Sequence, residues 1–302
     1  SSAVNAKAAL LSSVIDRLTA ADVNSIAEIQ SLATAVSAVI DAAANGASPT
    51  LEQLQMLGLV DATATNLSAI QAAITATADD GTGVNSFSGL QTLISRAANL
   101  HLIAQYNGSG TAPTTNSYSA AGISGVTTTN LALINSAVAV LSATATDTTA
   151  EVQTVVTTAA ALLALADGGS SAGTALSAAD FTTLGVSFNG SNSTTAVNAK
   201  AALLSNVIDR LSTTDVSSIA AIQALATAVS TVIDAAAGGS APSLQQLQSL
   251  GLSGVSADNL AAVVSAIAAT ADDGTGSDSL AELQALVNGA TLPTPDGVRG
   301  LA

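Results

Sequence analysis

An internal duplication constrains the fold more than any other feature of the 302 residues. When the sequence is shifted by 193 positions, Ala3–Ala47 aligns with Ala196–Ser240, and 35 of the 45 aligned residues are identical. The match continues in two shorter stretches, Leu57–Leu59 against Leu250–Leu252 and Ala78–Gly83 against Ala271–Gly276. Segments this similar are expected to share one structure, so the architecture must be repetitive.

A shorter period lies within the duplication. An apolar residue followed by glutamine recurs with Gln-to-Gln spacings of 61, 62, 70 and 61 residues, at Gln30, Gln91, Gln153, Gln223 and Gln284. A turn with a central glycine between small or apolar residues recurs at Gly58, Gly122, Gly185 and Gly251. These periods predict five units, at residues 1–48, 49–112, 113–173, 174–240 and 241–302. The first unit is expected to lack its opening segment, and the fifth ends in a tail that contains proline and glycine.

Apolar residues spaced by three and four predict α-helices along the whole chain. One such stripe consists of Val23, Ile26, Ile29, Leu32, Val36, Val39 and Ile40. Capping-box spacing marks helix starts at Ser25 with Glu28, Thr148 with Glu151, and Ser279 with Glu282. The predicted fold class is all-α, with small three-helix units in an extended tandem array. Beads joined by flexible linkers, at His101–Tyr118 and Ser187–Thr195, are the competing arrangement.

The composition excludes several classes of protein. Lys and Arg total 6 against 21 Asp and Glu, a formal charge of -15, which is unsuited to nucleic-acid binding. There is no cysteine, and His101 is the one histidine, so thiolate sites, multi-histidine metal sites and catalytic triads are excluded. The sequence therefore predicts no enzyme and no cofactor. No membrane span is expected, because the uncharged stretch Asn130–Thr146 is short and contains several polar residues.

The aspartate-glycine loops are the one constellation that could form a site. Carboxylate oxygens around flexible glycines are the kind of ligand that calcium takes, and the weak calcium candidates are Asp79, Asp80, Asp272, Asp273 and Asp278. The spacing does not match an EF-hand loop, so the favoured interpretation is a turn followed by an N-cap at Asn85 or Asp278. Asp16 with Arg17 and Asp209 with Arg210 are expected to form local ion pairs, and His101 to be a polar residue near a helix end.

The charge pattern indicates where such a protein works. From Ala97 to Thr146 there is no Lys, Arg, Asp or Glu, so solvent-facing positions must be uncharged polar residues. Such a surface is insensitive to salt, and six Lys and Arg residues leave few sites for trypsin-like proteases. Both properties favour an extracellular or cell-surface location. The cysteine-free Ala/Ser/Thr/Gly-rich helical repeats, with elements such as Ala271–Gly276 followed by Asp278–Leu283, resemble repeat regions of large bacterial adhesin-like and biofilm-matrix proteins.

The resemblance implies a secreted structural or adhesive role and carries over no binding residue. Three functions stay open at this point. The first is a stalk or spacer that holds an adhesive tip away from a cell. The second is a self-assembling subunit of a filament or surface layer, since contacts that do not close give open polymers. The third is a binding module for an unidentified partner. The expected partners are neighbouring repeats of the same chain or further copies of it.

Overall fold

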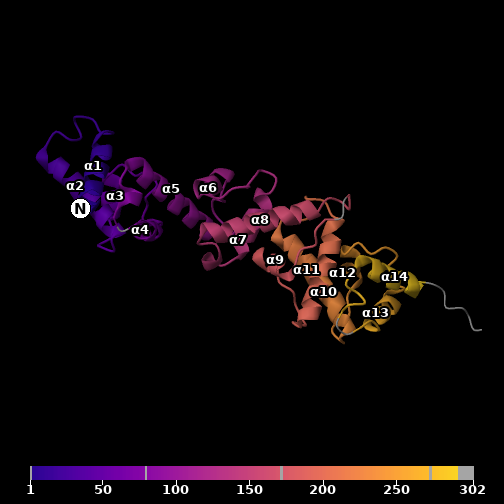
Figure 1. Cartoon of the computed structure of the whole chain (residues 1–302). Helices are drawn as coiled ribbons and strands as arrows, with labels where there is room; N and C mark the ends of the chain where they lie inside the picture. Colours follow the sequence, from indigo (N-terminus) through magenta and orange to yellow (C-terminus); the bar gives the residue numbers. More distant parts are fainter. Residues whose placement is uncertain (1, 79, 171–172, 272–273, 292–302) are drawn as a thin grey trace, which may run out of the picture. The chain divides into compact units, whose positions relative to one another are not determined.

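The computed structural model of the chain describes residues 2–78, 80–170, 173–271 and 274–291 (Figure 1). Within these ranges there are fourteen α-helices and two short 3-10 helices and no strand, which confirms the predicted all-α class. The α-helices are α1 (Ser2–Ile15), α2 (Ile26–Ala43), α3 (Leu51–Met56), α4 (Leu67–Thr75), α5 (Phe87–Ala104), α6 (Thr115–Ala120), α7 (Leu131–Val140), α8 (Thr149–Leu165), α9 (Ala178–Thr183), α10 (Thr194–Asp209), α11 (Ile219–Ala236), α12 (Leu244–Ser249), α13 (Leu260–Ala268) and α14 (Leu280–Thr291). The 3-10 helices are η1 (Thr82–Val84) and η2 (Ala143–Ala145).

The four shortest helices, α3, α6, α9 and α12, begin in the same way. Each has six residues and starts at a capping box, in which the N-cap hydroxyl accepts a hydrogen bond from the third helical residue. The side chain of that third residue binds the N-cap backbone N–H in return. The pairs are Thr50 with Gln53, Thr114 with Ser117, Ser177 with Asp180, and Ser243 with Gln246.

The same four helices also end alike. Each is followed by a glycine with φ between 81° and 84°, at Gly58, Gly122, Gly185 and Gly251. The next residue donates its N–H to the carbonyl five residues back, as in Leu59 to Leu54 at 3.2 Å. This is the Schellman motif, and its left-handed position favours glycine because a Cβ would be strained there. The recurring glycine turn of the sequence therefore stops a helix.

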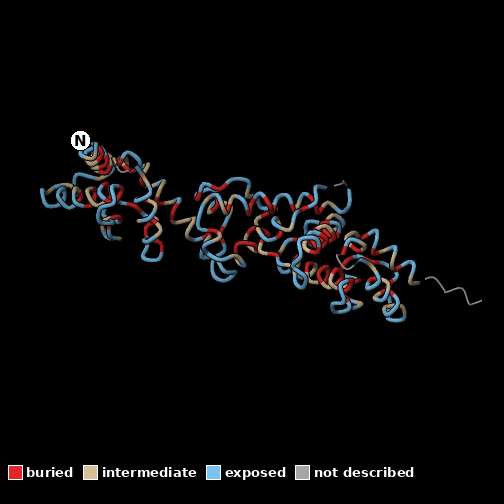
Figure 2. Tube along the Cα trace, turned by 60° about the horizontal axis from the view of Figure 1, so that its bottom comes forward, coloured by how far each residue is buried: buried red, intermediate tan, exposed pale blue. Residues whose placement is uncertain are grey.

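The chain divides into two compact units, and each has its own core (Figure 2). The first contains Ser1–Val126 and Ser142–Val152, and the second contains Thr127–Leu141 and Gln153–Ala302. In the first unit the fully buried side chains include Leu10, Ile70 and Leu90. In the second they include Leu204, Val229, Ile233 and Val263. Aliphatic side chains supply most of the burial, at about 1.5–3 kcal/mol for each fully buried one.

The two copies of the duplication have matching helices. The long helices α2 and α11 both contain 18 residues and start at positions related by the repeat, Ile26 and Ile219. A preceding helix packs against each, α1 against α2 in the first unit and α10 against α11 in the second. The serine before each long helix, Ser25 or Ser218, accepts a hydrogen bond from a backbone N–H of the first turn.

The helices α2 and α11 are also long and apolar enough to cross a membrane, judged by length and composition alone. This is weak evidence, because core helices of soluble proteins have the same properties, and more than half of the α11 window is buried within the protein. The uncharged stretch Asn130–Thr146 is a different segment of the chain. That stretch contains α7 and η2, which are shorter than a membrane span.

The two segments considered as linkers in the competing arrangement consist largely of ordered elements. His101 lies in the last turn of α5, and Tyr118 is fully buried within α6, which leaves a loop only at residues 105–114. In the second segment, Thr194 and Thr195 belong to α10. Ser187 is held by a hydrogen bond from its backbone N–H to Gln223 Oε1 at 2.9 Å. Gly/Ser/Asn composition favoured a linker here, but a side chain of α11 hydrogen-bonds to the backbone of this segment.

The predicted local ion pairs are also wrong. In the part of the chain that the structure describes, the ion pairs are Lys7 with Asp41 and Lys200 with Asp234. Arg17 instead lies over the ring of Phe87, with its guanidinium carbon 3.9 Å from the ring centroid. Asp16 and Arg17 lie in the turn that follows α1, and neighbours along a helical turn do not face each other.

Candidate functional site

The calcium candidates fall partly outside the described residues, since Asp79, Asp272 and Asp273 are not among them. Asp80 is described, and its Oδ1 accepts hydrogen bonds from the backbone N–H of Thr82 at 2.9 Å and from the Thr82 hydroxyl at 2.7 Å. These two bonds, the backbone one foremost, hold the pKa of Asp80 below its usual value because they stabilise the carboxylate. Asp80 therefore closes a tight turn with its own neighbour.

The glycine that follows each aspartate pair packs against a long helix. Gly81 has φ +78°, and a Cβ there would lie 2.9 Å from Ile40 Cγ2 of α2. Gly274 has φ +83°, and a Cβ there would lie 2.6 Å from Ile233 Cγ2 of α11. Both the left-handed backbone and the close approach require glycine. These contacts explain the loop as a turn against the core.

The predicted N-caps at Asn85 and Asp278 are one residue too early. The hydroxyl of Ser86 accepts from the N–H of Gly89 at 3.2 Å, so Ser86 caps α5. At α14 the hydroxyl of Ser279 accepts from the N–H of Glu282 at 3.3 Å. Among the described residues there is no group of three or more His, Asp or Glu side chains that could hold a metal ion.

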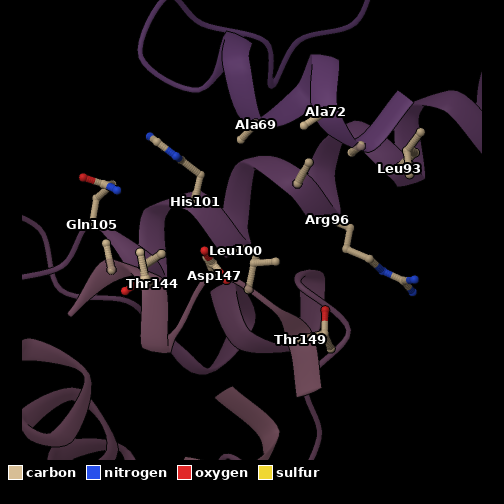
Figure 3. A pocket seen from close by; sticks show the side chains of 14 residues that line it. Ala69, Ala72, Leu93, Arg96, Leu100, His101, Gln105, Thr144, Asp147 and Thr149 are labelled. Carbon is tan, nitrogen blue, oxygen red and sulfur yellow. The ribbon is translucent and has the colours of Figure 1, made fainter. Parts of the chain in front are cut away.

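A hollow lies within the first unit, between α4, α5 and residues 143–149 (Figure 3). Its volume is about 580 Å³. Small and apolar side chains make up most of the wall of this hollow, and the polar side chains come from α5 with its C-cap and from the segment after α7. The lining residues are Ala69, Ala72, Ala73, Leu93, Arg96, Ala97, Leu100, His101, Ala104, Gln105, Ala143, Thr144, Asp147 and Thr149.

The polar residues of this hollow do not converge on one point. The side chains of Arg96 and His101 leave α5 in opposite directions (Figure 3). Arg96 lies against the turn after α6, because a Cβ on Gly122 would come within 3.1 Å of Arg96 Nε. A catalytic arrangement needs an acid, base or nucleophile within hydrogen-bond reach of its partner, and the described side chains of this wall form no such pair.

Sequence reasoning missed the two long-range ion pairs. Lys7 Nζ lies 2.7 Å from Asp41 Oδ1, and Lys200 Nζ lies 2.9 Å from Asp234 Oδ1. Each pair joins the helix before a long helix to the last turns of that long helix. The partners stand 34 residues apart in both copies, and the chain has no lysine besides these two. The conserved separation between the two copies was the signal that could have revealed them.

Two of the recurring glutamines, Gln223 and Gln284, clamp the backbone of the loop after the glycine turn. Gln223 accepts from the N–H of Ser187 at 2.9 Å and donates its amide to the Ser187 carbonyl at 2.9 Å. Gln284 makes the same two bonds with Ser253, at 3.0 Å each. In the first unit, Gln91 donates to the Asp61 carboxylate, again in the loop after a glycine turn. The motif thus joins a long helix to the loop after its own short helix.

In comparisons with protein-family models, with curated proteins and with solved structures, no match to this chain was found. A proposal for the function of this chain therefore rests on the chain's own repeated geometry. That geometry consists of capped short helices, glycine turns, glutamine clamps and paired lysine and aspartate residues.

Proposed function

We propose that the chain is a non-enzymatic structural protein of the bacterial cell surface or extracellular matrix, built of tandem three-helix units and acting as the repeat or stalk region of an adhesin. The observation that carries the proposal is the recurring order of helices. A helix of six residues is followed by one of intermediate length and then by a long one in α3–α5, α6–α8, α9–α11 and α12–α14. The first pair, α1 and α2, supplies an intermediate and a long helix.

Contacts between successive helix sets support an array rather than isolated beads. Within the second unit, α11 packs against α7 of the set before it and against α13 of the set after it. The backbone N–H of Ile219 at the start of α11 donates to Ser136 Oγ of α7 at 2.9 Å. In repeat proteins such contacts between neighbours provide a large share of the stability, because each repeat alone buries little surface.

The surface chemistry supports an extracellular setting. Charged residues make up 9% of the chain, and none stands between Ala97 and Thr146. The first unit uses its few cations structurally, Lys7 with Asp41, Arg17 over Phe87, and Arg96 against the turn at Gly122. A spacer that must keep its shape at varying salt benefits from packing that depends little on exposed charges.

A self-assembling filament or surface-layer subunit is the second candidate. It is favoured by large apolar side chains left exposed in the first unit, with Ile26 at 87%, Val60 at 81% and Val4 at 62%. Apolar groups on the outside of a repeat unit can stack against another unit and drive open-ended assembly.

Electron microscopy and light scattering of the purified chain test the proposal. We expect extended monomers. Regular polymers would favour the filament instead. A compact monomer that binds a small ligand in the hollow beside Arg96 would overturn both and identify a binding module.

A further inference from the structure

In the second copy of the duplication, four polar side chains from α10 and α11 hydrogen-bond to one segment of the backbone. This segment is residues 187–191, and the four side chains belong to Lys200, Gln223, Ser230 and Asp234. Lys200 Nζ donates to the carbonyls of Asn189 at 2.5 Å and Ser191 at 2.9 Å. Gln223 accepts a hydrogen bond from the backbone N–H of Ser187 at 2.9 Å. Ser230 accepts one from the N–H of Asn189 at 3.2 Å, and Asp234 accepts one from the N–H of Ser191 at 3.1 Å.

The first copy retains all four of these side chains. The equivalents at the 193-residue offset are Lys7, Gln30, Ser37 and Asp41, identical in type to their counterparts. In the described residues of the first copy, however, the side chains of Lys7 and Asp41 bond only to each other, and the side chains of Gln30 and Ser37 make no hydrogen bond. The side chains of Lys7 and Asp41 are 32% and 51% exposed, against 0% and 17% for Lys200 and Asp234.

The apolar residues beside these groups differ in the same direction. Ile26 is 87% exposed and Ile29 is 39% exposed, whereas their equivalents Ile219 and Ile222 are 2% and 0% exposed. Because the sequences of the two faces are nearly the same, this difference comes from what covers each face. In the second copy the cover consists of α7, α9 and the polar segment that leads from α9 into α10.

The second copy therefore shows which chemistry the uncovered face accepts. We infer that the face formed by Lys7, Gln30, Ser37 and Asp41 is a docking surface for a polypeptide segment with the chemistry of residues 174–193. Such a segment has a short capped helix, a glycine turn and an extended polar stretch. Its backbone carbonyls would accept from Lys7, and its N–H groups would donate to Gln30, Ser37 and Asp41. This inference deepens the proposed structural role, on which it rests, by naming the kind of partner that a repeat unit binds.

The two lysines make the test direct, because one lysine reports each face. Acetylation of amines in the intact chain, followed by mass spectrometry, gives a separate rate for Lys7 and for Lys200. We expect Lys7 to react at least about tenfold faster, since reaction at Lys200 requires local opening. A synthetic peptide of residues 174–193 contains no lysine and can be added in excess with its amino end blocked.

The peptide is expected to slow the labelling of Lys7 several-fold and to leave Lys200 unchanged. A scrambled peptide should change neither rate, and Gln30→Ala with Ser37→Ala should weaken the protection of Lys7. In a second form of the test, residues 174–193 are joined directly before Ser1, which reproduces the connection of the second copy. Lys7 in this extended chain should become as unreactive as Lys200.

Unchanged labelling of Lys7 with both the peptide and the joined segment would overturn the inference. Protection of Lys7 that grows with the concentration of the chain alone would identify a second copy as the occupant and would also overturn it. Failure of the stalk proposal gives a different result, a compact ligand-binding monomer by microscopy and scattering, so the two failures are distinguishable.

Discussion

Lys200 Nζ lies 2.9 Å from Asp234 Oδ1 in an ion pair whose lysine side chain is fully buried. The same ammonium donates to two backbone carbonyls, so its three donors are all used. A buried charge is tolerated only when it is paired and hydrogen-bonded in this way. The equivalent pair, Lys7 with Asp41, lies partly in solvent. One sequence feature therefore occupies two environments in the same chain.

Removing the two lysines should consequently have unequal effects. We expect Lys200→Met to destabilise the second unit by about 2–4 kcal/mol, because Asp234 and two carbonyls lose a buried donor. Lys7→Met should cost at most about 1 kcal/mol, as exposed ion pairs contribute little. Urea unfolding followed by circular dichroism measures both. Equal losses for the two variants would contradict the difference in burial.

The glycine turn after each short helix provides a second prediction. Gly251 has φ +82°, and a Cβ there would meet no atom within 4 Å. Gly251→Ala should therefore cost about 1–2 kcal/mol through left-handed strain alone. The matched control is Gly289 in α14, which is equally open to a Cβ. Gly289→Ala should stabilise the protein by about 0.4–1 kcal/mol, because alanine favours the helix. Thermal unfolding that ranks the two variants in the opposite order would refute this account.

The glutamine clamp at Gln223 provides a third prediction. Gln223→Ala removes both hydrogen bonds to the Ser187 backbone. We expect it to destabilise the second unit by about 1–2 kcal/mol, at the usual net value of a hydrogen bond. The control, Gln30→Ala, changes the equivalent exposed residue of the first copy and should stay within about 0.5 kcal/mol of the parent chain. Hydrogen exchange at the N–H of Ser187 should accelerate in the first variant and provides a local readout.

The sequence predicted the helices because the apolar spacing and the local caps agree. Ser25 and Glu28 form the reciprocal capping box that their spacing indicates, and the same bonds join Thr148 and Glu151. Local rules were insufficient where a serine directly follows the residue predicted as the cap. At Asn85 and Ser86, the 3-10 turn at η1 places the serine, rather than the asparagine, at the start of α5.

The candidate site was less predictable because it depends on contacts far apart in the sequence. Lys7 and Asp41 are separated by 34 residues, and no local spacing rule links them. The polar stretch from Ser187 resembled a flexible linker by composition, yet three of the four side chains that fix it lie more than 35 residues further along the chain. Duplication was the best available signal, since it retained both members of each pair.

Calcium is expected to have little influence on stability. Asp80 already uses one carboxylate oxygen to accept from Thr82, as a turn residue does. Thermal unfolding in calcium and in a chelator should therefore nearly coincide. A gain of about 4 kcal/mol, which corresponds to free calcium at roughly 1,000 times its dissociation constant, would instead show a site at these loops.

The capping box at the start of α8 makes the stability of the fold depend on pH. The hydroxyl of Thr148 donates to Glu151 Oε2 at 2.8 Å and its backbone N–H donates at 3.0 Å, and these two bonds lower the pKa of Glu151. A carboxyl whose pKa is lower in the folded state stabilises the fold above its unfolded pKa, about 4.3 for Glu, and that contribution is lost as pH falls through the folded pKa.

Thr148→Ala should raise the pKa of Glu151 toward the ordinary value, whereas Thr148→Ser, which keeps the hydroxyl, should leave it low. Carbon-13 NMR titration of the Glu151 carboxyl measures both. The stability difference between the parent and Thr148→Ala should narrow as the pH falls below about 4.3, and a difference that widened in acid would contradict the assigned role.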